Sequence, residues 1–210
     1  FESKLGDFVP PNSYDAHAHW YDLRHILPEE ELNDPPAENS EVGYDAMVDS
    51  MRRWMGSRLI TQGLYFPFPV RGLDCVAANQ FLARQLQEHA ECRGLMMIRP
   101  QDDPDAVERT LLEHRFAGFK VYHVFAEREK SFHAEQSEFL PAWAWDLADR
   151  HGLWITMHMV LPRALSDPRN AKYIQDHCLK YPNARLVLAH AARGFKAADT
   201  VDSIDQLRGL

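Results

Sequence analysis

The chain has 210 residues, of which 45% are hydrophobic and 26% are charged. This composition is typical of a globular domain and argues against a long disordered chain. The net charge of −8 opposes binding to nucleic-acid phosphates and anionic membranes. No apolar stretch reaches the roughly 20 residues that a membrane-spanning helix needs.

The cysteines Cys75, Cys92 and Cys178 are far apart in the sequence and form no C-x-x-C pair. A disulfide framework and a thiolate zinc cluster are therefore not expected. A reducing environment suits such a chain, and we expect a cytoplasmic protein.

Short apolar runs alternate with longer amphipathic segments along the chain. Strand centres are predicted near residues 16, 63, 97, 121, 157 and 188. The runs 153–161 and 186–189 are almost wholly apolar, which is typical of parallel strands covered on both faces. Helices are predicted between the strands, over residues 76–91, 105–115, 138–150 and 172–180, and again from Asp199 onwards.

One long interruption, residues 21–43, is rich in proline and glutamate and is predicted to be a loop insertion after the first strand. The remaining strand–helix repeats have the spacing of βα units, about 30 residues each. Six such units fit either a doubly wound sheet or a (β/α)8 TIM barrel. Because no G-x-G-x-x-G follows the first strand, a dinucleotide-binding sheet is disfavoured.

The first predicted strand carries the motif Asp15-Ala16-His17-Ala18-His19. Alternate residues of a strand share a face, so His17 and His19 are expected to point the same way. Their Cα atoms would be roughly 6.6 Å apart, and two imidazoles at that separation can hold one metal ion. Ordinary polar residues at a strand end are the alternative interpretation.

His158 and His190 lie at the downstream ends of two later strands. In a TIM barrel the carboxyl ends of all strands converge on one face, where active sites form. The four histidines are therefore predicted to meet in one pocket, and this favours the barrel. A hydrogen-bonded core histidine is the alternative for either residue taken alone. Imidazole ligands suit zinc, the expected ion, with manganese, iron and nickel as alternatives.

The chain resembles the amidohydrolase superfamily, in particular the amidohydrolase-related (amidohydrolase 2) branch. That branch includes metal-dependent hydrolases and aminocarboxymuconate-semialdehyde-type decarboxylases. The resemblance begins near residue 13, covers almost the whole chain, and rests on four segments: Asp15-Ala16-His17-Ala18-His19, Gly118-Phe119-Lys120, Ile155-Thr156-Met157-His158 and Leu188-Ala189-His190-Ala191.

The resemblance implies a role for each of the four histidines. His17, His19 and His158 match the residues that bind the metal in the family. His190 matches a residue that contacts the metal-bound water or the substrate, and is the predicted catalytic residue. The implied fold is α/β, a (β/α)8 barrel of the metal-dependent hydrolase type, represented here by roughly its first six βα units.

The sequence departs from the family pattern at two points. The last two βα units and the aspartate after strand eight are not found up to Leu210, and aspartates in the predicted last helix do not replace it. We therefore expect residues 1–210 to form a single barrel domain that is incomplete at its C-terminus. Relatives often carry Gly-x-Lys-x-His on strand four, whereas here Tyr122 takes the histidine position. On a straight strand, His123 would face away from Lys120, so it is not expected to be a ligand.

Four further residues are predicted to contact the substrate. Lys120 would hold a substrate carboxylate, with a carboxylated bridging ligand and an internal ion pair as alternatives. Arg99 and Arg193 could recognise an anionic substrate or form surface salt bridges. Trp20 could form a wall of the pocket or pack as local cover.

These observations predict a metal-dependent hydrolase that uses an activated water on an ester, lactone or amide of a small molecule, including anionic ones. One alternative is a metal-dependent, non-oxidative decarboxylase of a small unsaturated or aromatic carboxylic acid. Another is a catalytically silent barrel that binds a metal or a partner. We expect a small-molecule substrate, no nucleic-acid or membrane partner, and a homodimer.

Overall fold

The computed structural model describes residues 8–27 and 40–193. The chain divides into two compact units, Phe1–Leu95 and Met96–Leu210, and each is a body with its own strands and helices. The helix predicted from Asp199 onwards lies outside the described residues.

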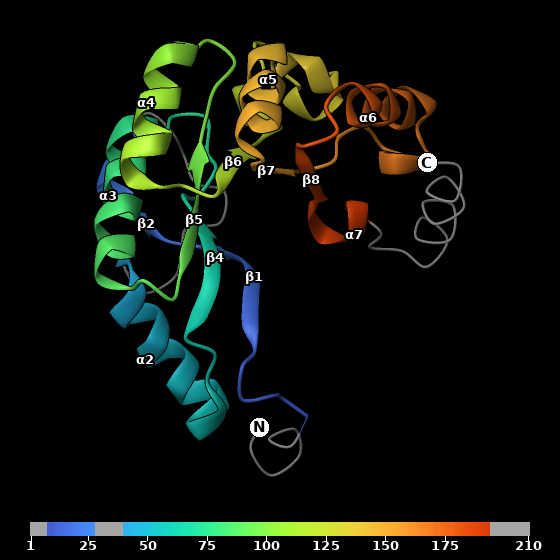
Figure 1. Ribbon diagram of the computed structural model, residues 1–210. Helices are drawn as coiled ribbons and strands as arrows, with labels where there is room; N and C mark the ends of the chain where they lie inside the picture. Colours follow the sequence, from blue (N-terminus) through green and yellow to red (C-terminus); the bar gives the residue numbers. More distant parts are fainter. Residues whose placement is uncertain (1–7, 28–39, 194–210) are drawn as a thin grey trace. The chain divides into compact units, whose positions relative to one another are not determined.

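The first unit is built on strands β1 (Tyr14–His19), β4 (Gln62–Phe66) and the start of β5 (Arg93–Met97). Strand β1 pairs in parallel with β4, and β4 pairs in parallel with β5 (Figure 1). Helix α3 (Cys75–Glu88) connects β4 to β5 and begins where the Asp74 carboxylate accepts a hydrogen bond from the Ala77 amide. The predicted strand–helix–strand order is confirmed here.

The segment between β1 and β4 contains more structure than the sequence predicts. Strands β2 (Tyr21–Asp22) and β3 (Glu41–Val42) pair antiparallel at the two ends of the predicted loop, and η1 (Leu23–His25) follows β2. Helix α2 (Tyr44–Met55) and the short η2 (Gly56–Arg58) then lead into β4. Helix α2 is not predicted because its apolar face is narrow, with Met47 as its one buried residue.

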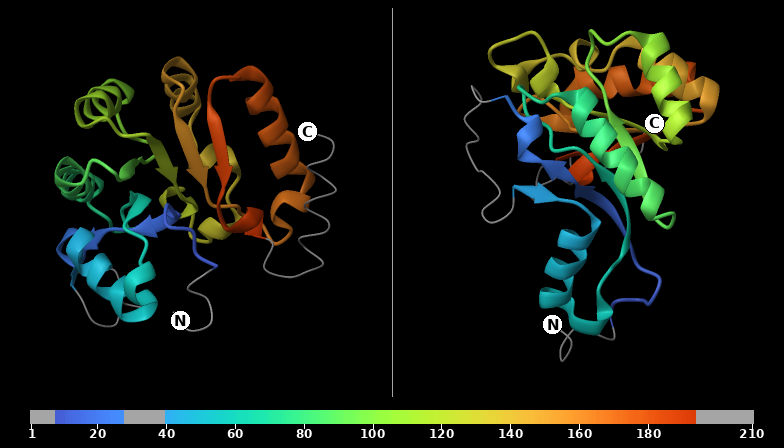
Figure 2. Two further views of the ribbon diagram at one scale, coloured as in Figure 1. Left: turned by 60° about the horizontal axis from the view of Figure 1, so that its bottom comes forward. Right: turned by 90° about the vertical axis from the view of Figure 1, so that its left-hand side faces the viewer.

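The second unit contains three parallel strands: β6 (Gly118–Val121), β7 (Trp154–Met157) and β8 (Arg185–Leu188). They lie side by side in Figure 1 and in the left view of Figure 2. Ile98, the residue after β5, lies beside β6, because its amide donates a hydrogen bond to the Lys120 carbonyl. The strand residues Phe119, Val121, Ile155 and Met157 are fully buried, as their continuous apolarity predicts.

Helices α4 (Pro104–His114), α5 (Ala142–His151) and α6 (Pro168–Lys180) alternate with these strands. Short turns occupy the connections, at η3 (His123–Phe125), η4 (Ser131–His133), η5 (Gln136–Glu138) and η6 (Ala164–Ser166). A last short element, α7 (Ala189–Arg193), follows β8.

Two predicted helix starts are wrong, and proline explains both. Helix α5 begins at Ala142 rather than at Glu138, because Pro141 is its N-cap and η5 ends before it. Helix α6 begins one turn earlier than predicted, where Asp167 caps the helix and Pro168 takes its first position.

Counted along the chain, six strands that pair in parallel alternate with helices. This is the order of the first six βα units of a TIM barrel, so the predicted fold class is confirmed. Among residues 8–27 and 40–193, no helix is both long enough and apolar enough to cross a membrane.

Gly118 lies very close to the neighbouring strand β7, and it provides a test of the β6–β7 pairing. Its φ is +154°, and a Cβ there would overlap the Trp154 carbonyl oxygen. Gly118→Ala should therefore lower the free energy of unfolding by more than about 3 kcal/mol, from backbone strain and overpacking together. Urea unfolding measures this loss.

Gly152→Ala is the matched control, since Gly152 also has positive φ (63°) but a Cβ there would meet no atom within 4 Å. Gly152→Ala should lower the free energy of unfolding by only about 1–2 kcal/mol, from backbone strain alone. Equal costs for the two variants would contradict the close approach of β6 and β7.

Candidate metal and catalytic site

The two histidines of β1 lie together in the first unit, as their spacing predicts. The ring centroids of His17 and His19 are 5.6 Å apart, in an edge-on arrangement. Phe66, on β4, packs against both rings, at 4.8 and 4.7 Å. The shared face persists although the β1–β4 register shifts between Asp15 and Ala18.

The backbone of the first unit also orients the His19 ring. Its Nδ1 atom lies 3.1 Å from the Pro67 carbonyl oxygen. Because a carbonyl oxygen only accepts, Nδ1 carries the proton and Nε2 holds the lone pair of the neutral ring. A hydrogen bond of this kind commonly fixes the orientation of metal-binding histidines.

His158 and His190 lie together in the second unit, with ring centroids 5.3 Å apart. His158 directly follows β7, and His190 comes two residues after the end of β8. Tyr122 and His123, after β6, pack against the His158 ring at 4.7 and 5.4 Å. With Lys120, these four side chains form what we call the histidine cluster.

His123 lies in this cluster, beside the His158 ring. Strand β6 ends at Val121 and the chain turns into η3 at His123, so the rule for a straight strand does not apply. The His123 ring stacks on Tyr122 at 4.7 Å, and its Nδ1 lies 3.0 Å from the Ser131 hydroxyl oxygen. A histidine one place after the family's usual position was the sequence signal for this residue.

Burial controls the charge of the cluster. Burial first, and then the charges of His123, Lys120 and His190, lower the pKa of His158 to about 3. Burial also lowers the pKa of Lys120 to about 7 and, together with the Lys120 charge, lowers the pKa of His190. Imidazoles held neutral in this way are the form that binds a divalent metal, so the donor chemistry fits such an ion.

The predicted site residues thus occur as two pairs, one in each unit. His17 and His19 belong to the first unit, and His158 and His190 belong to the second. Neither unit by itself, over the residues described, gathers three or more His, Cys, Asp or Glu side chains that could hold a metal ion. The pocket with four histidines stays a prediction.

Two of the predicted substrate-binding residues have ordinary structural contacts. The Arg99 guanidinium binds the Asp102 carboxylate, with N–O distances of 2.9 and 2.8 Å. Trp20 is fully buried and stacks on Tyr65 with ring centroids 3.8 Å apart. These contacts match the salt-bridge and local-cover interpretations of the sequence.

Arg193, by contrast, lies near the histidine cluster. Its charge lowers the pKa of Tyr122, although burial raises that pKa more strongly. Its Nη1 donates to the Leu161 carbonyl at 3.0 Å, and its guanidinium lies 4.3 Å from the centre of the Phe132 ring.

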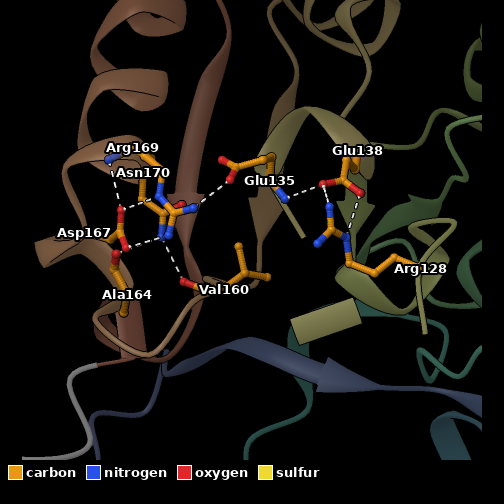
Figure 3. A network of polar contacts seen from close by, with 8 residues as sticks. All are labelled: Arg128, Glu135, Glu138, Val160, Ala164, Asp167, Arg169 and Asn170. Carbon is orange, nitrogen blue, oxygen red and sulfur yellow. Dashed lines mark hydrogen bonds and ion pairs between the residues drawn. The ribbon is translucent and has the colours of Figure 1, made fainter. Parts of the chain in front are cut away.

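A row of ion pairs ties the segment after β6 to the segment after β7 (Figure 3). Arg128 binds Glu138, whose carboxylate also accepts a hydrogen bond from the Glu135 amide. The Glu135 carboxylate binds Arg169 at 2.8 Å, and Arg169 binds Asp167 at 3.0 Å. The sequence does not predict this network, because its partners are 34 residues apart at the Glu135–Arg169 step.

The buried Asn170 strengthens the second of these segments. Its Nδ2 donates to the carbonyls of Val160 and Ala164, at 2.8 and 2.7 Å (Figure 3). These bonds close the chain that follows His158 into a compact loop. The loops that carry His123 and His158 are therefore fixed by polar contacts at their far ends.

Two solved structures are similar to the chain over 93% of its length. One is described as a probable 2-pyrone-4,6-dicarboxylic acid hydrolase from Acinetobacter baumannii with citric acid bound, with a TM-score of 0.61 and 13% identity. The other is an amidohydrolase II, with a TM-score of 0.62 and 14% identity. The chain spans 66% of the first structure and 72% of the second.

At this identity the likeness is one of fold, which the chain shares with these two TIM-barrel proteins. No protein-family model matches the sequence, and no curated protein does.

Lys120 gives a test of the electrostatics of the cluster. Its side chain is fully buried, and its pKa of about 7 lies below the usual 10.5. In metal-free protein, Lys120→Met should raise the free energy of unfolding by about 1–3 kcal/mol, by removing a buried polar group. The gain should be largest below pH 7 and should shrink toward pH 10.5. Between these values Lys120 keeps its proton in the unfolded wild type but loses it in the folded one, so the wild type becomes more stable as the pH rises.

Chemical unfolding in the presence of a chelator, at several pH values, measures the gain. Lys172→Met is the control, since that lysine is 76% exposed, and its effect should stay within about 0.5 kcal/mol. A loss of stability in Lys120→Met would support the internal ion pair that the sequence left open.

Proposed function

We propose that the protein is a metal-dependent hydrolase of the amidohydrolase type, acting on an ester, lactone or amide of a small molecule. The observation that carries the proposal is the pairing of histidines at the ends of parallel strands. His17 pairs with His19 on β1, and His158 pairs with His190 after β7 and β8. The fold shared with amidohydrolases adds support.

In this proposal His17, His19 and His158 hold a divalent metal, with zinc as the expected ion. When bound, such an ion lowers the pKa of a coordinated water toward neutrality and polarises a carbonyl. The low pKa of His158 keeps its ring neutral and available as a ligand at physiological pH. The carbonyl contact of His19 fixes the orientation of its ring, as such contacts do for metal-binding histidines.

His190 is the proposed acid–base residue. Its pKa is lowered by burial and by Lys120, so its ring is a neutral imidazole that can accept a proton at neutral pH. The contact with the His158 ring, at 5.3 Å, keeps it beside a metal ligand without requiring it to be one.

An anionic substrate suits the charges of the cluster. Lys120 acts on both His158 and His190, and Arg193 acts on Tyr122, so two basic groups lie near these rings. A substrate carboxylate would favour the charged form of Lys120 and be held by it. One similar structure is named for a dicarboxylic acid substrate and has citric acid bound, which describes an anionic ligand in that protein.

The same charges support the alternative reaction. A non-oxidative decarboxylase of an aromatic or unsaturated acid would also need cationic groups around its carboxylate. Turnover assays that offer lactones and esters beside aromatic acids separate the two enzymes. Metal binding without any turnover would support the silent, metal-binding barrel instead.

Two histidine variants of the full-length protein test the proposed roles. His17→Ala should lose most of its metal and its activity together, because a ligand is removed. His190→Ala should keep its metal content while turnover falls by about 100-fold or more, the usual size of an acid–base contribution. Metal analysis and steady-state kinetics on the same preparations measure both quantities.

His114→Ala, on the last turn of α4, is the control and should match the wild type in both. Equal and severe metal loss in His17→Ala and His190→Ala would make His190 a ligand and contradict its proposed role.

A further inference from the structure

The chain leaves β8 through an unusual turn that contains His190. Four successive residues without glycine, from His190 to Arg193, have φ values of 56°, 48°, 55° and 64°. Residues with a Cβ rarely adopt this left-handed conformation, because Cβ comes close to the following carbonyl oxygen. A run of four such residues therefore needs contacts from outside the turn to hold it.

Arg193 supplies such contacts at the end of the turn. Its Nη1 donates to the Leu161 carbonyl at 3.0 Å, and its guanidinium lies 4.3 Å from the centre of the Phe132 ring. The Leu161 amide in turn donates to the Phe132 carbonyl at 3.0 Å. Phe132, Leu161 and Arg193 thus contact one another in a closed set, which we call the three-loop clasp.

Each clasp residue belongs to a loop that carries one histidine of the cluster. Phe132 lies in the loop after β6 and packs against the His123 ring at 5.7 Å. Leu161 comes three residues after His158, and Arg193 comes three residues after His190. The clasp therefore joins the three loops close to the point where each presents its histidine.

We propose that Arg193 is a positioning residue that holds His190 in place beside His158. It acts through the left-handed turn, which it ties to the Leu161 carbonyl and the Phe132 ring. The inference rests on the proposed function for its catalytic consequence. It differs from substrate binding, the role that the sequence suggests for Arg193, because the guanidinium is used here on a backbone carbonyl and an aromatic face.

The clasp itself is tested by amide hydrogen exchange, which does not depend on activity. In full-length Arg193→Ala, the amides of residues 189–193 should exchange at least about tenfold faster than in the wild type, because the turn loses its outside contacts. Arg163→Ala is the matched control, since it removes an exposed arginine from the loop after β7 and should leave this exchange unchanged. Unchanged exchange in Arg193→Ala would overturn the proposal.

Kinetics with two matched substrates then separate positioning from substrate binding. The probes are a neutral ester and the same ester carrying a carboxylate. Positioning predicts that Arg193→Ala lowers kcat for both by about 10–100-fold, with KM nearly unchanged. Added guanidinium ion should restore part of the loss. A rise in KM for the anionic ester alone would show substrate binding and overturn the proposal.

A double variant tests whether Arg193 acts through His190. If Arg193 acts through His190, Arg193→Ala should cause no further loss of kcat in a His190→Ala background. Independent, additive losses would contradict the positioning role. Absence of turnover in the wild type would contradict the proposed function instead, while hydrogen exchange would still decide whether the clasp exists.

Discussion

The parallel register of β6, β7 and β8 is the constraint on which the second unit depends. Val121 pairs with Met157, and Met157 pairs with Leu188, so the three strands end level with one another. His158 is the first residue after β7, whereas His190 is the second residue after β8. The left-handed turn begins at His190, and the His190 ring lies beside the His158 ring.

Burial of the histidine cluster has opposite effects on function and on folding. The loss of hydration lowers the pKa of His158 to about 3, which keeps its ring neutral and suits metal binding, and it lowers the pKa of Lys120 to about 7. The same loss disfavours the folded chain, because the unfolded chain would hold those protons more readily. The apolar residues of the same strands offset this cost, since Phe119 and Ile155 are fully buried.

The strands and the histidine pairs could be predicted from the sequence, because both follow from local patterns. Continuous apolarity marks strands buried on both faces, and residues two apart on a strand share a face, as His17 and His19 do. The position of His123 could not be predicted in this way, since it depends on where β6 ends and turns. The contacts of Arg193 join residues distant in sequence and depend on tertiary packing.

The polar contacts around the loops after β6 and β7 differ in their response to salt. Arg169 and Glu135 are 56% and 44% exposed, so ions in solution screen their attraction. The bonds of Asn170 are buried at 1% exposure and are beyond the reach of that screening. As ionic strength rises, the loop after β6 therefore loosens first, while the loop that follows His158 keeps its shape. The contacts that hold the His123 side of the cluster therefore depend more on ionic strength than those that hold the His158 side.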